Sequence, residues 1–226
     1  MKAKVIEDSI NMSDIVYTKL KNQIINLNYR FGQKLNDSEL ALKFGVSRTP
    51  IREALSKLER DGFVLRIPNV GYFLRQFSLR DIKDLYYVRG LLEISAVKLA
   101  IKNLDSEKIN RLHQIVSNAR VLLEEDNLEK YTMASWQMHK ELVSYCDNKL
   151  LYQLISNLSE KLIMAARLGF SNPDRLFISQ EEHEILINYL QNGQAKVFIN
   201  YLKRHIANAE RNTLESIVEN PDRVFI

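Results

Sequence analysis

The fold is decided by the stretch SRTPIREAL at residues 47–55 and its continuation SKLERDGFV at residues 56–64. Ser47 can cap a helix, and Pro50 is tolerated in the first turn, where backbone N–H groups have no partner within the helix. Apolar residues at helical spacing form one buried face: Ile51, Ala54, Leu55 and Leu58. The stretch therefore predicts an amphipathic helix that Gly62 ends.

Two more helices are expected before this one. Residues 13–27 carry an apolar stripe at spacings of three and four and predict a helix capped by Ser13. Asn36 and Glu39 resemble a capping box, so a short helix is expected to begin there. The short helix, a tight turn and the helix after Ser47 form the outline of a helix-turn-helix.

A hairpin is expected after the amphipathic helix. Residues 63–67 and 70–74 flank Pro68 and Asn69, which favour a turn between two strands. Residues 34–35 fit a short edge strand. Three helices and a β-hairpin in about 60 residues predict a winged helix-turn-helix, with the hairpin as the wing.

The net charge of +4 is unevenly distributed along the chain. Residues 1–78 contain 13 Lys and Arg against 8 Asp and Glu, whereas residues 79–226 contain 19 against 20. The positive excess therefore lies in the first third of the sequence. Localised positive charge favours binding to a polyanion such as nucleic acid, because each contact neutralises a phosphate and releases a counterion.

Arg48, Thr49 and Arg52 share a face of the predicted helix that is separate from its apolar face. The N-terminal half of a recognition helix places side chains on base edges and phosphates, and Arg can bond both O6 and N7 of guanine. Arg66 and Asn69 stand at the expected wing tip. The alternatives are a helical hairpin with merely solvated arginines, or a winged helix that contacts proteins.

The same residues resemble the GntR family of bacterial transcription regulators. The resemblance is carried by residues 47–55, 58–59 and 61–64 and by Gly71-Tyr72-Phe73 at the end of the wing. It implies a homodimer that binds palindromic, double-stranded operator DNA. Pattern and resemblance together give these candidate DNA contacts: Ser38, Ser47, Arg48, Thr49, Arg52, Arg66, Asn69 and Gly71. Ser38 stands where family members often have an arginine, so the operator preference could differ there.

The chain beyond residue 78 is helical in pattern. Ser78 and Asp81 form a second capping box. Six helices are expected, near residues 79–102, 105–125, 127–146, 149–169, 176–192 and 194–218. The prediction is a mainly α protein with a flexible arm at 1–12, a DNA-binding domain at 13–75 and an all-helical ligand-binding and dimerisation domain at 78–220.

The composition favours a cytoplasmic protein. No uncharged apolar run approaches the ~18 residues that a membrane span requires, so no membrane partner is expected. The first twelve residues carry Glu7 and Asp8 and lack the long apolar core of a secretory signal. The single Cys146 fits a reducing compartment.

Arg89 falls within an apolar stripe of the first C-terminal helix. A guanidinium that faces a core requires an anion, because an unpaired buried charge is costly. Glu93, one turn along, is one candidate partner, and a bound carboxylate ligand is the other. Both could hold at once.

His139, His183 and His205 each lie in line with apolar residues, on three different predicted helices. A single histidine on an apolar face is usually a satisfied core residue. Three of them in one bundle could converge on an interior metal site. Spacing along the sequence does not show whether they do.

The C-terminal part resembles the all-helical FCD effector domain of FadR-like GntR regulators. The matching segments are residues 89–93, 138–139 and 182–184, together with the spacing to His205. Many members bind a divalent metal there through one Asp and three His, which implies Zn, Ni or a similar ion at His139, His183 and His205. Ser135 replaces the Asp, four residues before His139. The resemblance further implies that Arg89 and Ser135 face the effector.

The consequence of Ser135 can be argued in two ways. Three neutral imidazoles leave a dication with its full charge and an open position, which favours an anionic effector. Alternatively, the metal is lost and the histidines bind the ligand directly. We favour a retained metal.

The sequence therefore predicts a homodimeric repressor controlled by a small carboxylate or sugar acid. A metal-dependent helical enzyme is the first alternative, but no HExxH motif or phosphate-binding loop is present, and Glu182 and Glu184 lie on other helix faces than His183. We therefore expect no enzymatic role. The second alternative is a protein-docking module whose winged helix does not bind DNA.

Overall fold

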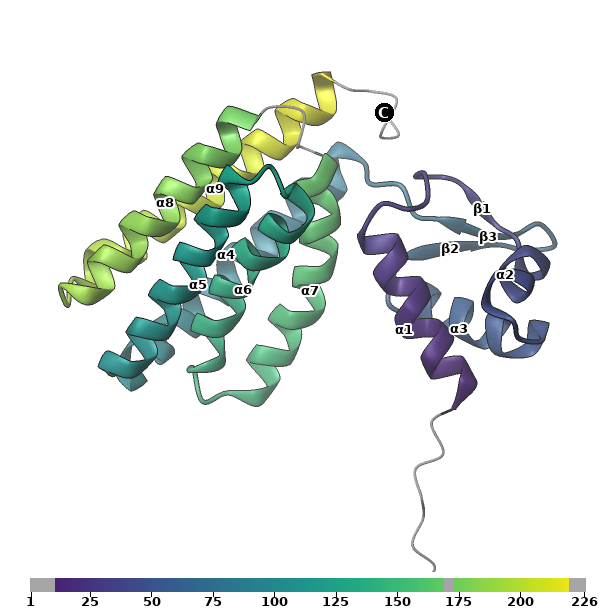
Figure 1. Ribbon diagram of the computed structural model, residues 1–226, viewed down its shortest axis with the longest axis horizontal. Helices are drawn as coiled ribbons and strands as arrows, with labels where there is room; N and C mark the ends of the chain where they lie inside the picture. Colours follow the sequence, from purple (N-terminus) through teal and green to yellow (C-terminus); the bar gives the residue numbers. More distant parts are fainter. Residues whose placement is uncertain (1–10, 169–172, 220–226) are drawn as a thin grey trace, which may run out of the picture. The chain divides into compact units, whose positions relative to one another are not determined.

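The computed structural model describes residues 11–168 and 173–219 (Figure 1). The chain divides into two compact units between Gln76 and Phe77. Most of the arm expected at residues 1–12 lies outside the described residues. The two units are described separately below.

The N-terminal unit contains three helices and three strands. Its elements are α1 (Met12–Ile25), β1 (Lys34–Leu35), α2 (Asp37–Phe44), α3 (Arg48–Arg60), β2 (Val64–Ile67) and β3 (Gly71–Leu74). The strands form one antiparallel sheet in the order β1-β3-β2. This arrangement confirms the predicted winged helix-turn-helix, including the short edge strand.

The wing and the helix ends show how local sequence fixes this unit. Asn69 has φ +61° in the turn between β2 and β3, a conformation that Asn tolerates better than most residues. The Asn36 side chain accepts a hydrogen bond from the backbone N–H of Ser38 at the start of α2. The expectation that Ser13 caps α1 is wrong, because Asn11 is the cap and accepts from the N–H of Ser13.

The core of the N-terminal unit lies between α1, α3 and the sheet. Leu20 and Ile24 of α1 are fully buried, and so are Ile51 and Leu55 of α3. Phe63, which precedes β2, is also buried, with only 2% of its surface exposed. This core fixes the orientation of α3, whose opposite face is free to carry polar residues.

The C-terminal unit is an all-helical bundle, as predicted (Figure 1). Its elements are α4 (Leu79–Ala100), a 3-10 turn η1 (Ile101–Asn103), α5 (Ser106–Glu124), α6 (Leu128–Ser144), α7 (Lys149–Leu168), α8 (Pro173–Gln191) and α9 (Ala195–Glu219). The predicted capping box of Ser78 and Asp81 starts α4. None of the helices in the described ranges has a stretch long and apolar enough to cross a membrane.

The packing of the bundle places α4 beside α6 and α9, and α8 beside α9. Helix α4 packs against α6, α7 and α9, and α8 packs against α5 and α9. The interior is mostly apolar, but α4 places Arg89 and Glu93 in it with 3% and 1% of their surfaces exposed. Buried charges of this kind require partners: Arg89 and Glu93 pair with each other, and His139 of α6 pairs with Glu93.

Candidate DNA-binding face and buried histidine site

Helix α3 presents two distinct faces. Its predicted apolar residues are fully buried, whereas Arg48, Thr49 and Arg52 are exposed. Ser47 occupies the N-cap position, but its side chain makes no capping hydrogen bond and is exposed. The polar face at the start of α3 is therefore open to a partner.

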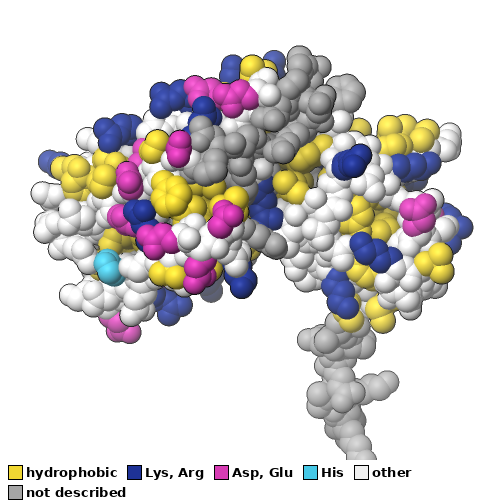
Figure 2. Space-filling view, turned by 45° about the horizontal axis from the view of Figure 1, so that its top comes forward, with side chains coloured by type: hydrophobic (Ala, Val, Ile, Leu, Met, Phe, Trp, Pro, Cys, Tyr) yellow, Lys and Arg dark blue, Asp and Glu magenta, His cyan; other side chains and the backbone are white. Residues whose placement is uncertain are grey.

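A cleft separates the start of α3 from the wing. Its lining includes four cationic side chains and one acid: Lys34, Arg48, Arg52, Arg66 and Asp37. Figure 2 shows Lys and Arg side chains over the N-terminal unit with few acidic ones between them, whereas the two signs alternate over the helical unit. A cleft lined mainly by one sign of charge attracts a ligand of the other sign.

Only some of the other candidate DNA contacts lie at this cleft. Asn69 and Gly71 of the wing line it, and the Arg66 guanidinium lies 5.9 Å from the centre of the Tyr72 ring. Ser38 is exposed near the start of α2. Ser47 and Thr49 line a separate, shallow depression. The cleft thus brings together Arg48, Arg52, Arg66, Asn69 and Gly71.

Asp37 holds both arginines of α3, a contact that sequence reasoning missed. Nη2 of Arg48 donates to Oδ1 and Oδ2 of Asp37 at 3.0 and 2.8 Å, and Nε of Arg52 donates to Oδ2 at 2.7 Å. These hydrogen bonds, from Arg48 first and then Arg52, lower the pKa of Asp37 to about 2. No spacing rule relates these residues, because the contact joins two helices.

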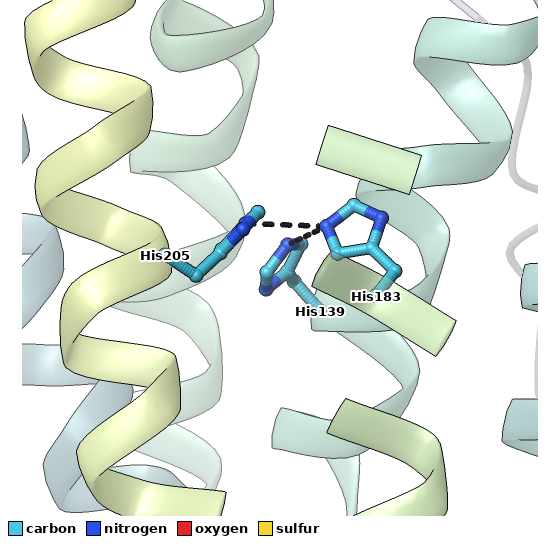
Figure 3. Close-up of side chains that lie close together, drawn as sticks. All are labelled: His139, His183 and His205. Carbon is cyan, nitrogen blue, oxygen red and sulfur yellow. Dashed lines mark hydrogen bonds between the residues drawn. The ribbon is translucent and has the colours of Figure 1, made fainter. Parts of the chain in front are cut away.

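The three histidines converge in the interior of the bundle (Figure 3). His139 comes from α6, His183 from α8 and His205 from α9. Nε2 of His183 lies 3.1 Å from Nε2 of His139 and 3.2 Å from Nε2 of His205. All three side chains are buried. The structure therefore brings together the residues that the sequence could only place on separate helices.

Carboxylates orient two of the imidazoles through contacts at their Nδ1 atoms. Oε1 of Glu93 lies 2.6 Å from Nδ1 of His139, and Oε2 of Glu182 lies 2.6 Å from Nδ1 of His205. Asn208 donates to the other oxygen of Glu182. Because a carboxylate accepts the Nδ1–H, the Nε2 atom keeps its lone pair and faces the centre of the cluster.

The protonation of the cluster follows from its burial. Burial lowers the pKa of His139 to about 4, even though the charge of Glu93 acts in the opposite direction. Burial, together with the charges of His205, His139 and Arg89, holds the pKa of His183 well below its ordinary value. Both imidazoles are therefore neutral near pH 7, which is the form that binds a metal.

The donor set fits a divalent cation. Lone pairs on two nitrogens 3.1–3.2 Å apart repel one another unless a proton or a cation lies between them. Tetrahedral coordination at about 2.0–2.1 Å per Zn–N bond separates the nitrogens by about 3.3 Å, which is close to the separations in the two pairs that include His183. The candidate ligand atoms of all three histidines lie within 4.8 Å of one another. Among the described residues, no carboxylate joins the three histidines as a ligand. Nδ1 of His183 is buried without a hydrogen-bond partner from the described part of the chain.

Arg89 lies beside the cluster and is paired with Glu93. Its Nε donates to Oε2 of Glu93 at 2.8 Å, and its Nη2 lies 3.3 Å from Nε2 of His139. The guanidinium also lies 4.4 Å from the centre of the Trp136 ring. The expected pairing with Glu93 is thus confirmed, and Glu93 links Arg89 to His139 directly.

A small cavity of about 90 Å³ opens beside Arg89, His139 and His183. Ser135 lines it, on the same wall as Trp136 and His139. Arg175 also lines it and donates to Glu215 and to the backbone oxygen of Asn212. Cationic, hydroxyl and imidazole groups therefore meet at one cavity.

Glu182 is the residue of this site that sequence reasoning passed over. It does lie on a different face of α8 from His183, but that face meets α9 and His205. Glu184, on a further face, forms a two-point ion pair with Arg120 of α5 at 2.8 and 2.9 Å. The signal that could have revealed Glu182 is the frequency with which metal-binding histidines donate Nδ1–H to a carboxylate.

A winged helix with a cationic cleft, joined to a helical unit with a polar buried cavity, defines a DNA-binding transcriptional regulator with an effector domain. Residues 12–74 match the gntR family of bacterial regulatory proteins, and residues 84–208 match the FCD domain. The chain belongs to the GntR family of transcriptional regulators, in the FadR-like group that carries an FCD domain.

Individual relatives agree with this placement. The chain is 26% identical over 208 residues to the HTH-type transcriptional regulator YdhC of Bacillus subtilis, covering 90% of this chain and 93% of that protein. It is 30% identical over 164 residues to the Nta operon transcriptional regulator of Aminobacter aminovorans, covering 70% and 74%. It is 21% identical over 207 residues to the transcriptional repressor RspR of Escherichia coli, covering 92% and 91%. These relatives are transcriptional regulators, not enzymes.

The fold is also found among solved structures. A GntR transcriptional regulator from Rhodococcus sp. RHA1 superposes with a TM-score of 0.80 at 20% identity, over 90% of this chain and 97% of that one. This similarity shows that the chain has the same architecture.

Proposed function

We propose that this regulator is a cytoplasmic repressor whose affinity for operator DNA is controlled by a small anionic metabolite bound with a divalent metal in the C-terminal unit. The observation that carries the proposal is the cluster of three buried imidazoles, two of which, His139 and His183, line a cavity together with Arg89. The name of RspR as a repressor supports the direction of control. The bound metabolite releases the operator.

The effector class follows from the charge of the site. Three neutral imidazoles do not offset the charge of a dication, and the wall of the cavity offers Ser135 rather than a carboxylate. A bound metal supplies a Lewis-acidic position that an anion can occupy. Arg89 adds a positive charge beside His139 and has nitrogens that Glu93 does not use. A small carboxylate or sugar acid can bind both the metal and the Arg89 guanidinium.

DNA binding is assigned to the cleft of the N-terminal unit and to the exposed start of α3. Arg48, Thr49 and Arg52 read base edges or phosphates from α3, and Arg66 and Asn69 contact the DNA from the wing. The effector acts by binding one arrangement of the protein more tightly than another, because a ligand with equal affinity for both shifts nothing.

The homodimer is part of the same proposal. Helix α4 leaves Tyr87 and Leu91 exposed at 70% and 55%, beside a groove that Lys98 also lines. Asp84 and Lys98 each lie seven residues from Leu91, so they share its face. When two copies of α4 pair antiparallel about Leu91, Asp84 of one copy meets Lys98 of the other. A second copy of this chain therefore complements this exposed face of α4.

Selection of genomic DNA tests the proposal. The purified protein, with and without added zinc and a panel of small carboxylates, is incubated with fragmented genomic DNA at physiological salt, and the bound fragments are sequenced. We expect a short palindrome whose enrichment falls when one of the acids is added. Absence of enrichment under every condition would contradict the proposal.

A further inference from the structure

We propose that Asp37 is a specificity-determining positioning residue, which orders Arg48 and Arg52 so that Arg52 presents its two terminal nitrogens to a guanine. The proposal rests on the assignment of α3 as the DNA-reading helix. It concerns a residue of α2 that itself makes no base contact.

The hydrogen bonds to Asp37 determine which donor nitrogens each arginine has available for DNA. Arg52 donates Nε to Asp37, so both of its Nη atoms are free of described partners. Two parallel Nη donors match the O6 and N7 acceptors of guanine. Arg48 instead gives Nη2 to both carboxylate oxygens. It keeps Nε and Nη1, which lie on different edges of the guanidinium and do not form a parallel pair for one guanine, so each is left to contact a phosphate singly.

Asp37 is anchored better than the residues it holds. Its side chain is 21% exposed, whereas those of Arg48 and Arg52 are 55% and 62% exposed. Two long cationic side chains at adjacent turns of a helix repel each other and sample many rotamers when nothing holds them. The shared carboxylate orders them before DNA arrives, which reduces the entropy lost on binding.

The same carboxylate opposes non-specific binding. It places a negative charge in a cleft that meets phosphates, so it lowers the affinity for any duplex. Asp37 therefore lowers the affinity for DNA of any sequence and raises the selectivity for the operator. A variant that lacks the charge should bind random DNA at least as tightly but discriminate the operator less well. Simple repulsion by Asp37 would instead change the affinities for operator and random DNA in the same direction.

The test compares selection from a random duplex library by the wild-type protein, Asp37→Asn and Asp14→Asn. Asp14 is an exposed acid of α1 that pairs with Lys57, so its loss changes the charge of the unit equally without touching Arg48 or Arg52. For Asp37→Asn we expect one guanine per half-site to lose its selection and the operator-to-random affinity ratio to fall about tenfold or more. Affinity for random DNA rises or stays the same. Asp14→Asn retains the wild-type motif.

Two further variants keep the test decisive. Arg52→Lys, which keeps the charge, should lose the same guanine, and adding Asp37→Asn to it should cause no further loss. Asp37→Ser replaces Asp37→Asn if the latter unfolds. An unchanged motif, or operator and random affinities that rise in parallel, would overturn the proposal. Failure of the wild-type protein to enrich any motif would instead overturn the assignment of α3 as the reading helix, and this proposal with it.

Discussion

Glu93 is the residue on which the buried site depends most. Burial acts to raise the pKa of its carboxyl. The charge that His139 carries once it is protonated at acid pH, the charge of Arg89 and the hydrogen bonds from both residues outweigh this effect and hold the pKa below its ordinary value. The ionised carboxylate therefore serves two partners, Arg89 through Oε2 and His139 through Oε1. Replacement of Glu93 changes both the charge balance of the core and the orientation of one candidate metal ligand.

Glu93→Gln is expected to destabilise the protein by about 3–5 kcal/mol, because the Arg89 guanidinium is left buried without its counter-ion. Zinc affinity should fall about 10- to 100-fold, because the amide holds the His139 tautomer less firmly. Urea unfolding and competition with a chromophoric chelator measure the two effects. Glu181→Gln, an exposed change on α8, is the matched control, with an effect within about 0.5 kcal/mol. Equal stabilities of the two variants would contradict this account.

His183 is central to the cluster because its Nε2 lies close to both other imidazoles. His183→Ala is expected to abolish zinc uptake and leave the affinity for DNA unchanged. Metal analysis after dialysis and fluorescence anisotropy with a labelled duplex measure the two properties. His113, which is exposed on α5, supplies the control His113→Ala, and this variant should retain the metal. Normal zinc content in His183→Ala would remove His183 from the site.

At the scale of elements, the contact between α2 and α3 makes the N-terminal unit sensitive to acid. The pKa of Asp37 is about 2 in the folded protein and 3.8 ordinarily, so its ion pairs add stability at pH values above 3.8. This contribution falls as the pH drops from 3.8 toward 2. We expect Asp37→Asn to lose less stability than the wild type over this window, in urea unfolding at pH 5 and pH 2.5. Identical losses would show that the pairs do not persist in solution.

The elements were predictable because their signals are local. Helix α3 was expected from Ser47 to Gly62 and spans Arg48–Arg60, since its apolar periodicity and the glycine stop need no tertiary information. Helix α8 begins at Pro173 rather than residue 176, in agreement with the preference of proline for the first helical position. The contact of Asp37 was not predictable, because it joins two helices whose packing no spacing in the sequence encodes. The contact between Glu182 and His205 also joins two helices, so spacing does not show it, and only the general preference of metal-binding histidines for a carboxylate partner indicates it.

At the scale of the whole molecule, the proposed dimer predicts a charge-reversal pair. Lys98→Glu places like charges opposite Asp84 of the second copy and should weaken dimerisation, whereas Asp84→Lys combined with Lys98→Glu should restore it. Sedimentation velocity over a concentration series measures the change. Lys140→Glu, an exposed change on α6, should have no effect. If Lys98→Glu also leaves dimerisation unchanged, α4 does not form the interface in this register.

The measurement that tests the central claim most directly is the affinity for genome-selected operator DNA of zinc-loaded protein, titrated with a panel of small carboxylates and sugar acids. The wild type is compared with His183→Ala. We predict that at least one acid lowers the affinity of the wild type about tenfold or more and leaves that of the variant unchanged. Equal effects of that acid on both proteins, or no effect of any acid on the wild type, would contradict control of DNA binding through the buried histidine site.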